Sequence, residues 1–184
     1  MLDEQQLGDY IDRHFTRELF RLETLDRYDV GSNGDDYERY VAGQPGPTMS
    51  RKGPWMDQIR GEVARGLHTY RVHVVRSPLT DYLRFEFEWG YTYNAEAGEH
   101  IRILDLAEQA RPADLIDEDF WLIDNERVLR MAYDPAGQYL GADLAPETAV
   151  QRYRAASKAA WSAAVPFDDY WHAHPQYRRD RRAA

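Results

Sequence analysis

The stretch YRVHVVRSPLTDYLRFEFEWGYTYN, residues 70–94, decides the fold, because it predicts a strand followed closely by a helix. In residues 70–75 every second side chain is Tyr or Val, with Arg and His between them, which is the period-two pattern of a strand. Ser77 as N-cap and Pro78 as the first helical residue then predict a helix to the end of the stretch.

The chain after this stretch predicts more strands and two helices. Three strand-like segments are separated by the turn sequences DNE and DPAG, which is typical of a β-meander. Proline limits the helices, because it fits the first helical turn and interrupts later ones. The expected elements are a turn at Ala97-Gly98, strands over 100–104, 120–123, 127–133 and 138–142, a helix over 147–164 between Pro146 and Pro166, and a short helix over 167–172.

The chain before the stretch predicts two helices joined by a long loop. Its first residues place Leu, Ile, Tyr and Phe at helical spacing, as in an amphipathic helix. Gly and Pro are then concentrated between the helices. The expected elements are a helix over 2–22, a short strand or irregular segment over 21–30, a loop over 31–54 with an optional helical turn at 35–41, and a helix over 55–65 ended by Gly66.

These elements predict one α+β domain with a mixed, largely antiparallel sheet and flanking helices. The length of 184 residues fits a single domain. We expect this domain to span residues 1–175, and we expect a disordered basic tail over 176–184.

The composition excludes several classes of protein. The absence of Cys excludes disulfide frameworks, thiol catalysis and thiolate metal sites. No apolar run approaches the ~20 residues of a membrane helix, and the acidic first residues are unlike a signal peptide. We therefore expect a soluble, cytoplasmic protein without membrane contact.

Acidic side chains dominate two segments of the chain. Residues 1–50 hold 5 basic and 11 acidic side chains, and residues 106–145 hold 3 and 9. Nucleic-acid binders usually present a basic face, and here only the cluster Arg178-Arg179-Asp180-Arg181-Arg182 is basic. We therefore expect no direct nucleic-acid binding.

The sequence contains none of the common catalytic motifs. Phosphate-binding loops and the Gly-x-Ser-x-Gly elbow are absent, and only two residues, Lys52 and Lys158, could perform lysine chemistry. His172 and His174 form a His-x-His pair after Asp168, but a rigid metal site needs three or four ligands. We expect no catalytic residue, no bound metal and no cofactor. His73 is expected on a half-exposed face of its strand and not as a catalytic base.

The strongest candidate site is polar and aromatic and lies on the helix of the opening stretch and its neighbouring strand. Charged and phenolic groups stand there next to large apolar ones. A buried Arg–Glu pair in this group could fix the helix to the sheet or line a ligand pocket. The candidate ligand-binding residues are Arg71, Tyr82, Glu86, Tyr91 and Asn94.

Three strings together resemble one known family: RLETLDRYDV, RVHVVRSPLTDYLRFEFEW and FWLIDNERVLRMAYDPAGQYLGADLA. It is an actinobacterial family of domain-of-unknown-function proteins of similar length, typically encoded beside helix-turn-helix regulators. The resemblance covers nearly the whole chain and implies a regulatory context but no reaction. Among 23 basic residues only two are Lys, a bias that fits such a source.

The order of elements is also similar to a phospholipase D-type unit. The His-x-Lys-x4-Asp motif of that group is missing, because Ser50 and Ala156 stand two residues before the two lysines. This similarity implies a shared unit without phosphodiesterase chemistry.

Two functions therefore stay open. The first is a non-enzymatic interaction module that acts with a helix-turn-helix regulator, whose basic surface the acidic segments would attract. The alternative is a small-molecule sensor or degenerate enzyme with a polar-aromatic pocket. A deep pocket with converging polar groups would favour the sensor, and a flat apolar patch would favour the interaction module.

Overall fold

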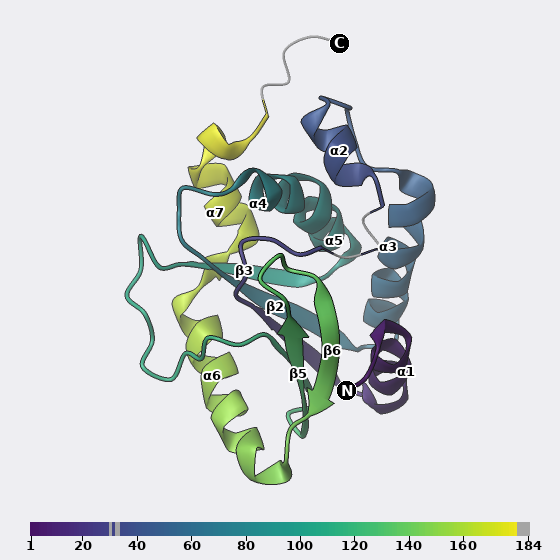
Figure 1. Ribbon diagram of the computed structural model, residues 1–184, viewed down its shortest axis with the longest axis vertical. Helices are drawn as coiled ribbons and strands as arrows, with labels where there is room; N and C mark the ends of the chain where they lie inside the picture. Colours follow the sequence, from purple (N-terminus) through teal and green to yellow (C-terminus); the bar gives the residue numbers. More distant parts are fainter. Residues whose placement is uncertain (30, 32–33, 180–184) are drawn as a thin grey trace.

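A seven-stranded mixed sheet forms the centre of the protein, whose computed structural model describes residues 1–29, 31 and 34–179 (Figure 1). The strand order is β6-β5-β4-β1-β2-β3-β7. β1 pairs with β2, and β2 with β3, in parallel, whereas the other neighbours are antiparallel. The strands are β1 (Glu18–Glu23), β2 (His68–Val75), β3 (His100–Asp105), β4 (Phe120–Ile123), β5 (Arg127–Tyr133), β6 (Tyr139–Leu144) and β7 (Val165–Pro166).

Helices cover both faces of this sheet. α6 packs on one face, where it buries the apolar side chains of the central strands, and α1 and α3 lie on the other side (Figure 1). The expected α+β domain with a mixed, largely antiparallel sheet is confirmed. The helices are α1 (Glu4–His14), α2 (Asp36–Val41), α3 (Met49–Ala64), α4 (Asp81–Phe85), the π-helix η2 (Glu86–Tyr91), α5 (Thr92–Ala97), the 3-10 helix η3 (Glu147–Ala149), α6 (Val150–Ala163), α7 (Phe167–Ala173) and the 3-10 helix η4 (Pro175–Tyr177).

Alternation along β2 is confirmed, but the prediction for His73 is wrong. Val72 and Val74 enter the core under α6, whereas Arg71 and His73 point to the opposite face. That face is itself covered by helices, so His73 is fully buried and not half-exposed. The polar residues at every second position of β2 predicted a solvent-exposed face, whereas in the structure this face is a buried polar layer between the sheet and the helices.

The predicted helix over 2–22 is too long. α1 ends at His14, and Phe15 takes an extended conformation. The backbone N–H groups of residues 16–18 then donate to the carboxylate of Asp124 in the β4–β5 turn. This capture redirects the chain, so β1 begins at Glu18.

Two helix starts also differ from their predictions. The helix after β2 begins beyond Thr80, whose Oγ1 accepts from the N–H of Leu83 at 3.2 Å, so Thr80 and not Ser77 is its N-cap. α3 begins at Met49 and not at residue 55, so Pro54 lies inside the helix and not ahead of it. The last residues of the predicted 31–54 loop are therefore helical, and α2 forms the optional turn.

The C-terminal segment packs against α2 and η2. The Arg179 guanidinium carbon lies 4.0 Å from the ring centre of Tyr40 and 5.0 Å from that of Trp89, and its nitrogens bind the Glu88 carboxylate. Residues 180–184 of the predicted tail lie outside the described residues. Among the described residues, no helix combines the length and apolar character needed to cross a bilayer.

Shortening Leu19 to Ala should lower the free energy of unfolding by about 2–5 kcal/mol, because Leu19 is buried among Phe15, Ile123 and Leu129. Chemical denaturation measures this loss. Leu140→Ala is the control, since Leu140 is 57% exposed on β6 and its truncation should change the value by under about 0.5 kcal/mol. Equal losses for the two variants would contradict the packing of β1 described above.

Candidate functional site

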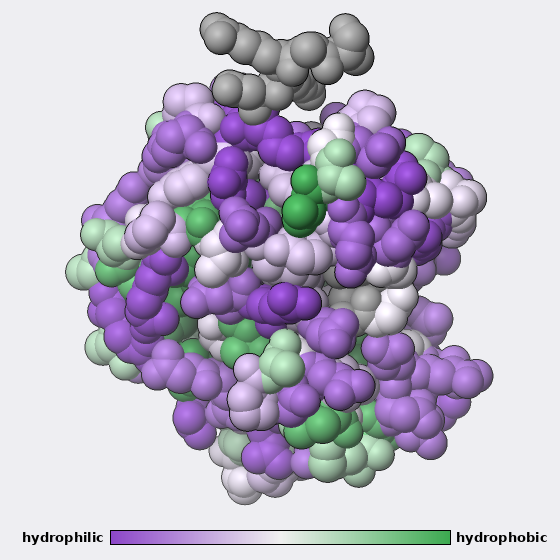
Figure 2. All heavy atoms as spheres, turned by 45° about the horizontal axis from the view of Figure 1, so that its top comes forward, coloured by the Kyte–Doolittle hydropathy of each residue, from purple (hydrophilic) through white to green (hydrophobic). Residues whose placement is uncertain are grey.

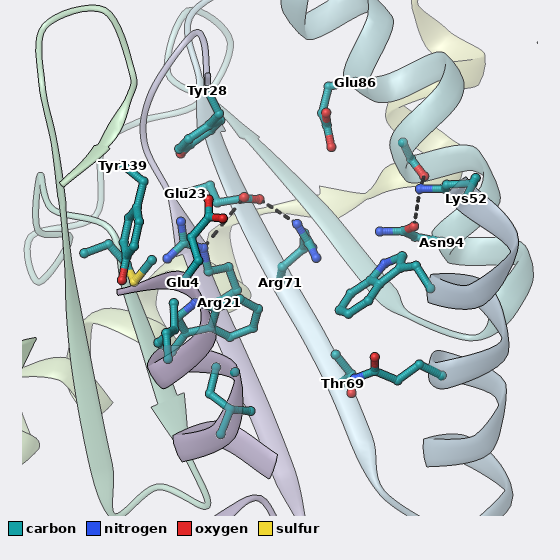
Figure 3. A pocket seen from close by; sticks show the side chains of 18 of the residues that line it. Glu4, Arg21, Glu23, Tyr28, Lys52, Thr69, Arg71, Glu86, Asn94 and Tyr139 are labelled. Atoms are coloured by element: carbon teal, nitrogen blue, oxygen red, sulfur yellow. Dashed lines mark hydrogen bonds and ion pairs between the residues drawn. The ribbon is translucent and has the colours of Figure 1, made fainter. Parts of the chain in front are cut away.

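A cavity of about 520 Å³ lies between the sheet and helices α1, α3 and α4. β1 and β2 form its floor, and β5 and β6 close the side opposite α3 (Figure 3). The volume suits a small organic ligand.

The outer surface differs from the cavity. On the face seen in Figure 2, hydrophilic side chains predominate, and hydrophobic ones form small, separate groups.

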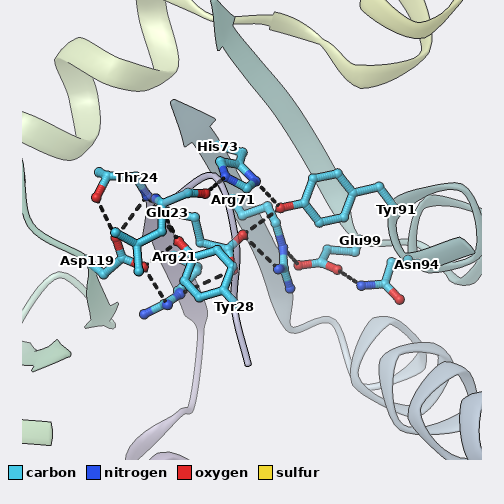
Figure 4. Close-up of polar contacts among 12 residues, drawn as sticks. Arg21, Glu23, Thr24, Tyr28, Arg71, His73, Tyr91, Asn94, Glu99 and Asp119 are labelled. Carbon is cyan, nitrogen blue, oxygen red and sulfur yellow. Dashed lines mark hydrogen bonds and ion pairs between the residues drawn. The ribbon is translucent and has the colours of Figure 1, made fainter. Parts of the chain in front are cut away.

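The floor of the cavity carries a row of buried charges. Arg21 and Glu23 of β1 lie beside Arg71 and His73 of β2 in the parallel register (Figure 4). Arg71 donates from Nη1 to Glu23 at 3.0 Å and from Nε to Glu99 at 2.6 Å. Such pairs stabilise a fold only when their partners are held in place, because an unpaired buried charge is costly.

The β1 end of this row is anchored by Asp119. Its carboxylate accepts from Arg21 at 2.9 Å and from the Tyr28 hydroxyl at 2.6 Å. Arg21 also donates to the Tyr133 hydroxyl at 2.8 Å, while its Nη1 is buried and has no hydrogen-bond partner among the described residues. The row thus ends on an unused donor beside the cavity.

The other end of the row reaches helix α3. Asn94 donates to the second carboxylate oxygen of Glu99 at 2.8 Å, and its side-chain oxygen accepts from Lys52 at 2.7 Å. Lys52 also donates to the carbonyl oxygen of Gly90 at 3.2 Å. Burial lowers the pKa of Lys52, an effect that Glu86 partly opposes. The row connects Asp119 near β4 with α3 on the opposite wall.

Glu23 is the central anion. Burial alone would raise its pKa, but Arg71 and Arg21 outweigh this effect and lower the pKa to about 2. The Tyr91 hydroxyl donates to Glu23 at 2.7 Å and lies 2.6 Å from Nδ1 of His73. Nε2 of His73 carries a hydrogen, because it lies 2.9 Å from the carbonyl oxygen of Leu25, which can only accept.

The π-helix η2 brings Glu86 over the cavity. Its wide turn is marked by the backbone N–H of Thr92, which donates to the carbonyl oxygen of Phe87 five residues earlier; the Thr92 hydroxyl donates to the same oxygen at 2.9 Å. A Cβ on Gly90 would lie 2.6 Å from a carboxylate oxygen of Glu86, so glycine makes room for this side chain. Burial and then repulsion by Glu23 raise the pKa of Glu86. No donor among the described residues binds its carboxylate.

The remaining lining is mainly apolar and aromatic. α1 contributes Leu7 and Ile11, and the adjoining strands contribute Leu19, Trp121 and Met131. These residues make one end of the cavity mainly apolar, whereas the row of charges lies at the other end. Further aromatic rings line the walls: Tyr28, Trp55, Tyr82, Phe85, Trp89, Tyr133 and Tyr139.

Four of the five candidate residues from the sequence line this cavity: Arg71, Tyr82, Glu86 and Asn94. The fifth, Tyr91, is fully buried behind the floor, where it joins Glu23 to His73. Their ligand-binding role stays a prediction.

Several lining residues were missed. Lys52 fell in a segment interpreted as loop, Arg21 fell where the expected helix over 2–22 overlaps the next segment, and Glu23 fell in the segment 21–30 interpreted as a short strand or irregular. The period-two pattern of ELFRLE, residues 18–23, is the signal that could have revealed β1.

The His-x-His pair lies away from the cavity. Nδ1 of His172 lies 2.6 Å from the carbonyl oxygen of Asp168, and Nδ1 of His174 lies 2.7 Å from that of Tyr170. Nε2 of His174 pairs with Glu108 at 2.7 Å. Within the described ranges, no group of three or more His, Asp or Glu is suited to hold a metal ion.

The fold and the cavity define an α+β domain with an internal polar-aromatic site. The chain belongs to the family of the domain of unknown function DUF6879, whose model matches residues 5–172. No curated protein matches the sequence. The expected membership in a family of unknown function is confirmed.

Acid should weaken the fold through Glu23. Because folding lowers its pKa from 4.5 to about 2, Glu23 contributes stability above pH 4.5 that is lost as the pH falls toward 2, up to about 3 kcal/mol. In Glu23→Gln this part of the acid dependence should disappear. Denaturant titrations between pH 5 and pH 3 measure the slope.

The matched control for this prediction is Glu96→Gln, since Glu96 is exposed on α5. This variant should keep the slope of the natural protein. A Glu23→Gln variant with the natural slope would show that the charged row does not hold Glu23 as described.

Proposed function

We propose that this protein is a small-molecule sensor that binds its ligand in the cavity. The observation that carries the proposal is that polar groups with no hydrogen-bond partner among the described residues, the Glu86 carboxylate above all, converge on one end of a cavity of about 520 Å³. Of the two functions that the sequence leaves open, this proposal takes the alternative, the small-molecule sensor, and not the interaction module alone. A site with an apolar body and a few placed polar groups is the usual form of a ligand pocket.

The regulatory part of the proposal concerns a partner. We propose that the sensor acts with a helix-turn-helix regulator of an actinobacterial source, as the resemblance of the sequence implies. α1 supports this role, because Leu7 and Ile11 face the cavity while Asp9 is exposed and does not line it. A ligand that touches the inner side of α1 would shift a helix whose outer side attracts a basic partner.

Filling the cavity should abolish ligand binding. Gly8→Phe places a ring in the mouth, because Gly8 lines the cavity and a Cβ there meets nothing within 4 Å. The natural protein, incubated with extract of its host and washed, should release a small molecule on denaturation that the variant does not. Mass spectrometry of the released compounds provides the comparison.

Asp9→Phe is the control for this experiment, since Asp9 is exposed on α1 and does not line the cavity. It should retain the same compound as the natural protein. Identical compound sets from Gly8→Phe and the natural protein would refute a sensor that uses this cavity.

Binding of the regulator should depend on α1. Asp9→Lys should weaken the complex with the neighbouring regulator about threefold, with most of the change in the association rate at low salt. Surface plasmon resonance at two ionic strengths measures both rates. An unchanged association rate would place the contact elsewhere and overturn the role of α1.

A further inference from the structure

We infer that the ligand is an α-amino acid with a large apolar or aromatic side chain, held by its ammonium and carboxylate groups at the charged end of the cavity. This inference rests on the proposed function and names its ligand class. Three features of the lining carry it: spare cationic donors, a carboxylate without a donor, and an apolar end beyond them.

Two cations have donors to spare for a carboxylate. Arg71 uses Nε for Glu99 and Nη1 for Glu23, and its Nη2 has no partner among the described residues. Lys52 donates to two oxygens and has three hydrogens on Nζ. Both side chains line the cavity and point toward its charged end (Figure 3). A carboxylate is the ligand group that accepts from both at once.

Glu86 is the matching group for an ammonium. It lacks an ion-pair partner within the about 4 Å of a salt bridge in the described part of the chain. Lys52 and Arg71 are nevertheless near enough to lower its pKa, against the larger effects of burial and of Glu23. Glu86, Lys52 and Arg71 all line the same cavity, so the walls of this end carry charges of both signs. A ligand with an ammonium and a carboxylate on the same carbon matches such a lining.

Glu23 does not compete for the ammonium. Its Oε2 accepts from both Arg71 and Tyr91, and its Oε1 lies 3.7 Å from Nε of Arg21, so two guanidinium groups already balance its charge. Glu86 is thus the acidic side chain at this end whose hydrogen-bonding capacity is unused among the described residues. The ligand's ammonium would relieve the electrostatic cost of this carboxylate.

The apolar end selects the side chain of the amino acid. Leu7, Ile11, Leu19, Trp121 and Met131 form most of its wall, while the exposed side chains of Glu4 and Asp12 also border it and the Arg21 guanidinium lies 5.1 Å from the Trp121 ring centre. A volume of about 520 Å³ exceeds what a small amino acid would fill, so a bulky apolar side chain is needed to displace its water.

Ligands with one charge fit less well. A simple amine would leave the spare donors of Arg71 and Lys52 unmatched, and a simple acid would be repelled by Glu86. Each unmatched group costs affinity because it stays desolvated without a partner. The zwitterion satisfies both sides.

The test uses isothermal titration calorimetry with L-phenylalanine, L-leucine and L-tryptophan. At least one should bind with a Kd below about 1 mM. For that amino acid, the matching amine without the carboxylate and the matching acid without the ammonium should each bind about tenfold more weakly or worse. For phenylalanine these analogues are phenethylamine and 3-phenylpropionate.

Glu86→Gln identifies the ammonium contact. This variant should lose about tenfold in affinity for the amino acid but should not lose affinity for the matching acid, which lacks an ammonium. Asp81→Asn is the control, because Asp81 is exposed at the start of α4 and should leave all affinities unchanged. Thermal melting should show Glu86→Gln to be folded and at least as stable as the natural protein, since it removes a half-buried carboxylate whose pKa is raised by desolvation and by Glu23.

The outcomes separate this inference from the proposed function. If the cavity retains a compound from extract but none of the three amino acids binds, the ligand class is wrong and the sensor stands. If the amine or the acid binds as tightly as the amino acid, or if Glu86→Gln leaves the affinity for the amino acid unchanged, the inference that the site binds both the ammonium and the carboxylate is wrong. If Gly8→Phe retains the same compounds as the natural protein, both proposals fail.

Discussion

The row of buried charges on β1 and β2 is the constraint on which the rest of the structure depends. Arg21, Glu23 and Arg71 are each largely buried on a sheet face that helices cover, and each needs a partner from another element. Asp119 comes from the segment before β4, and Glu99 from the segment before β3. An unpaired member would cost several kcal/mol, so the elements that supply partners are fixed relative to one another. The charged end of the cavity is therefore preorganised before any ligand arrives.

The sequence predicted correctly those elements whose hydrophobic spacing and turn residues fit either a strand or a helix, but not both. The meander over β4–β6 was predicted because its strands are short, alternate and are joined by strong turns. The start of β1 was missed because Leu19 and Leu22, three residues apart, continue the helical spacing, although in β1 they lie on opposite faces of the sheet. The capture of the chain by Asp124 is a contact across more than 100 residues, which no local pattern shows. Of the candidate residues on the predicted long helix, Tyr82, Glu86 and Asn94 line the cavity and Tyr91 lies behind its floor, because the local pattern shows which residues face the sheet but not which of them border a cavity. Lys52 and Glu23 reach the cavity only through the tertiary arrangement, which no local pattern contains.

The wall opposite the sheet shows a different compromise. η2 departs from ideal helical geometry, Gly90 removes packing atoms, and Glu86 holds a carboxyl group in a place that raises its pKa. Each of these choices weakens the isolated fold, and all three occur within one wide helical turn. Natural proteins concentrate such costs where a site must bind or react. This coincidence is the physical reason to regard the cavity as selected and not as a packing defect.

The central place of β1 in the sheet affects how the protein is made. Its parallel neighbour β2 follows about 50 residues later, and its antiparallel neighbour β4 about 100 residues later. At ribosomal rates of roughly 5–20 residues per second, β1 waits roughly 5–20 seconds for its second partner. During this time Arg21 and Glu23 keep the emerging strand hydrated, although the same charges become buried later. The side chains that form the polar floor of the cavity are thus also of the kind that opposes pairing of an open strand with other chains.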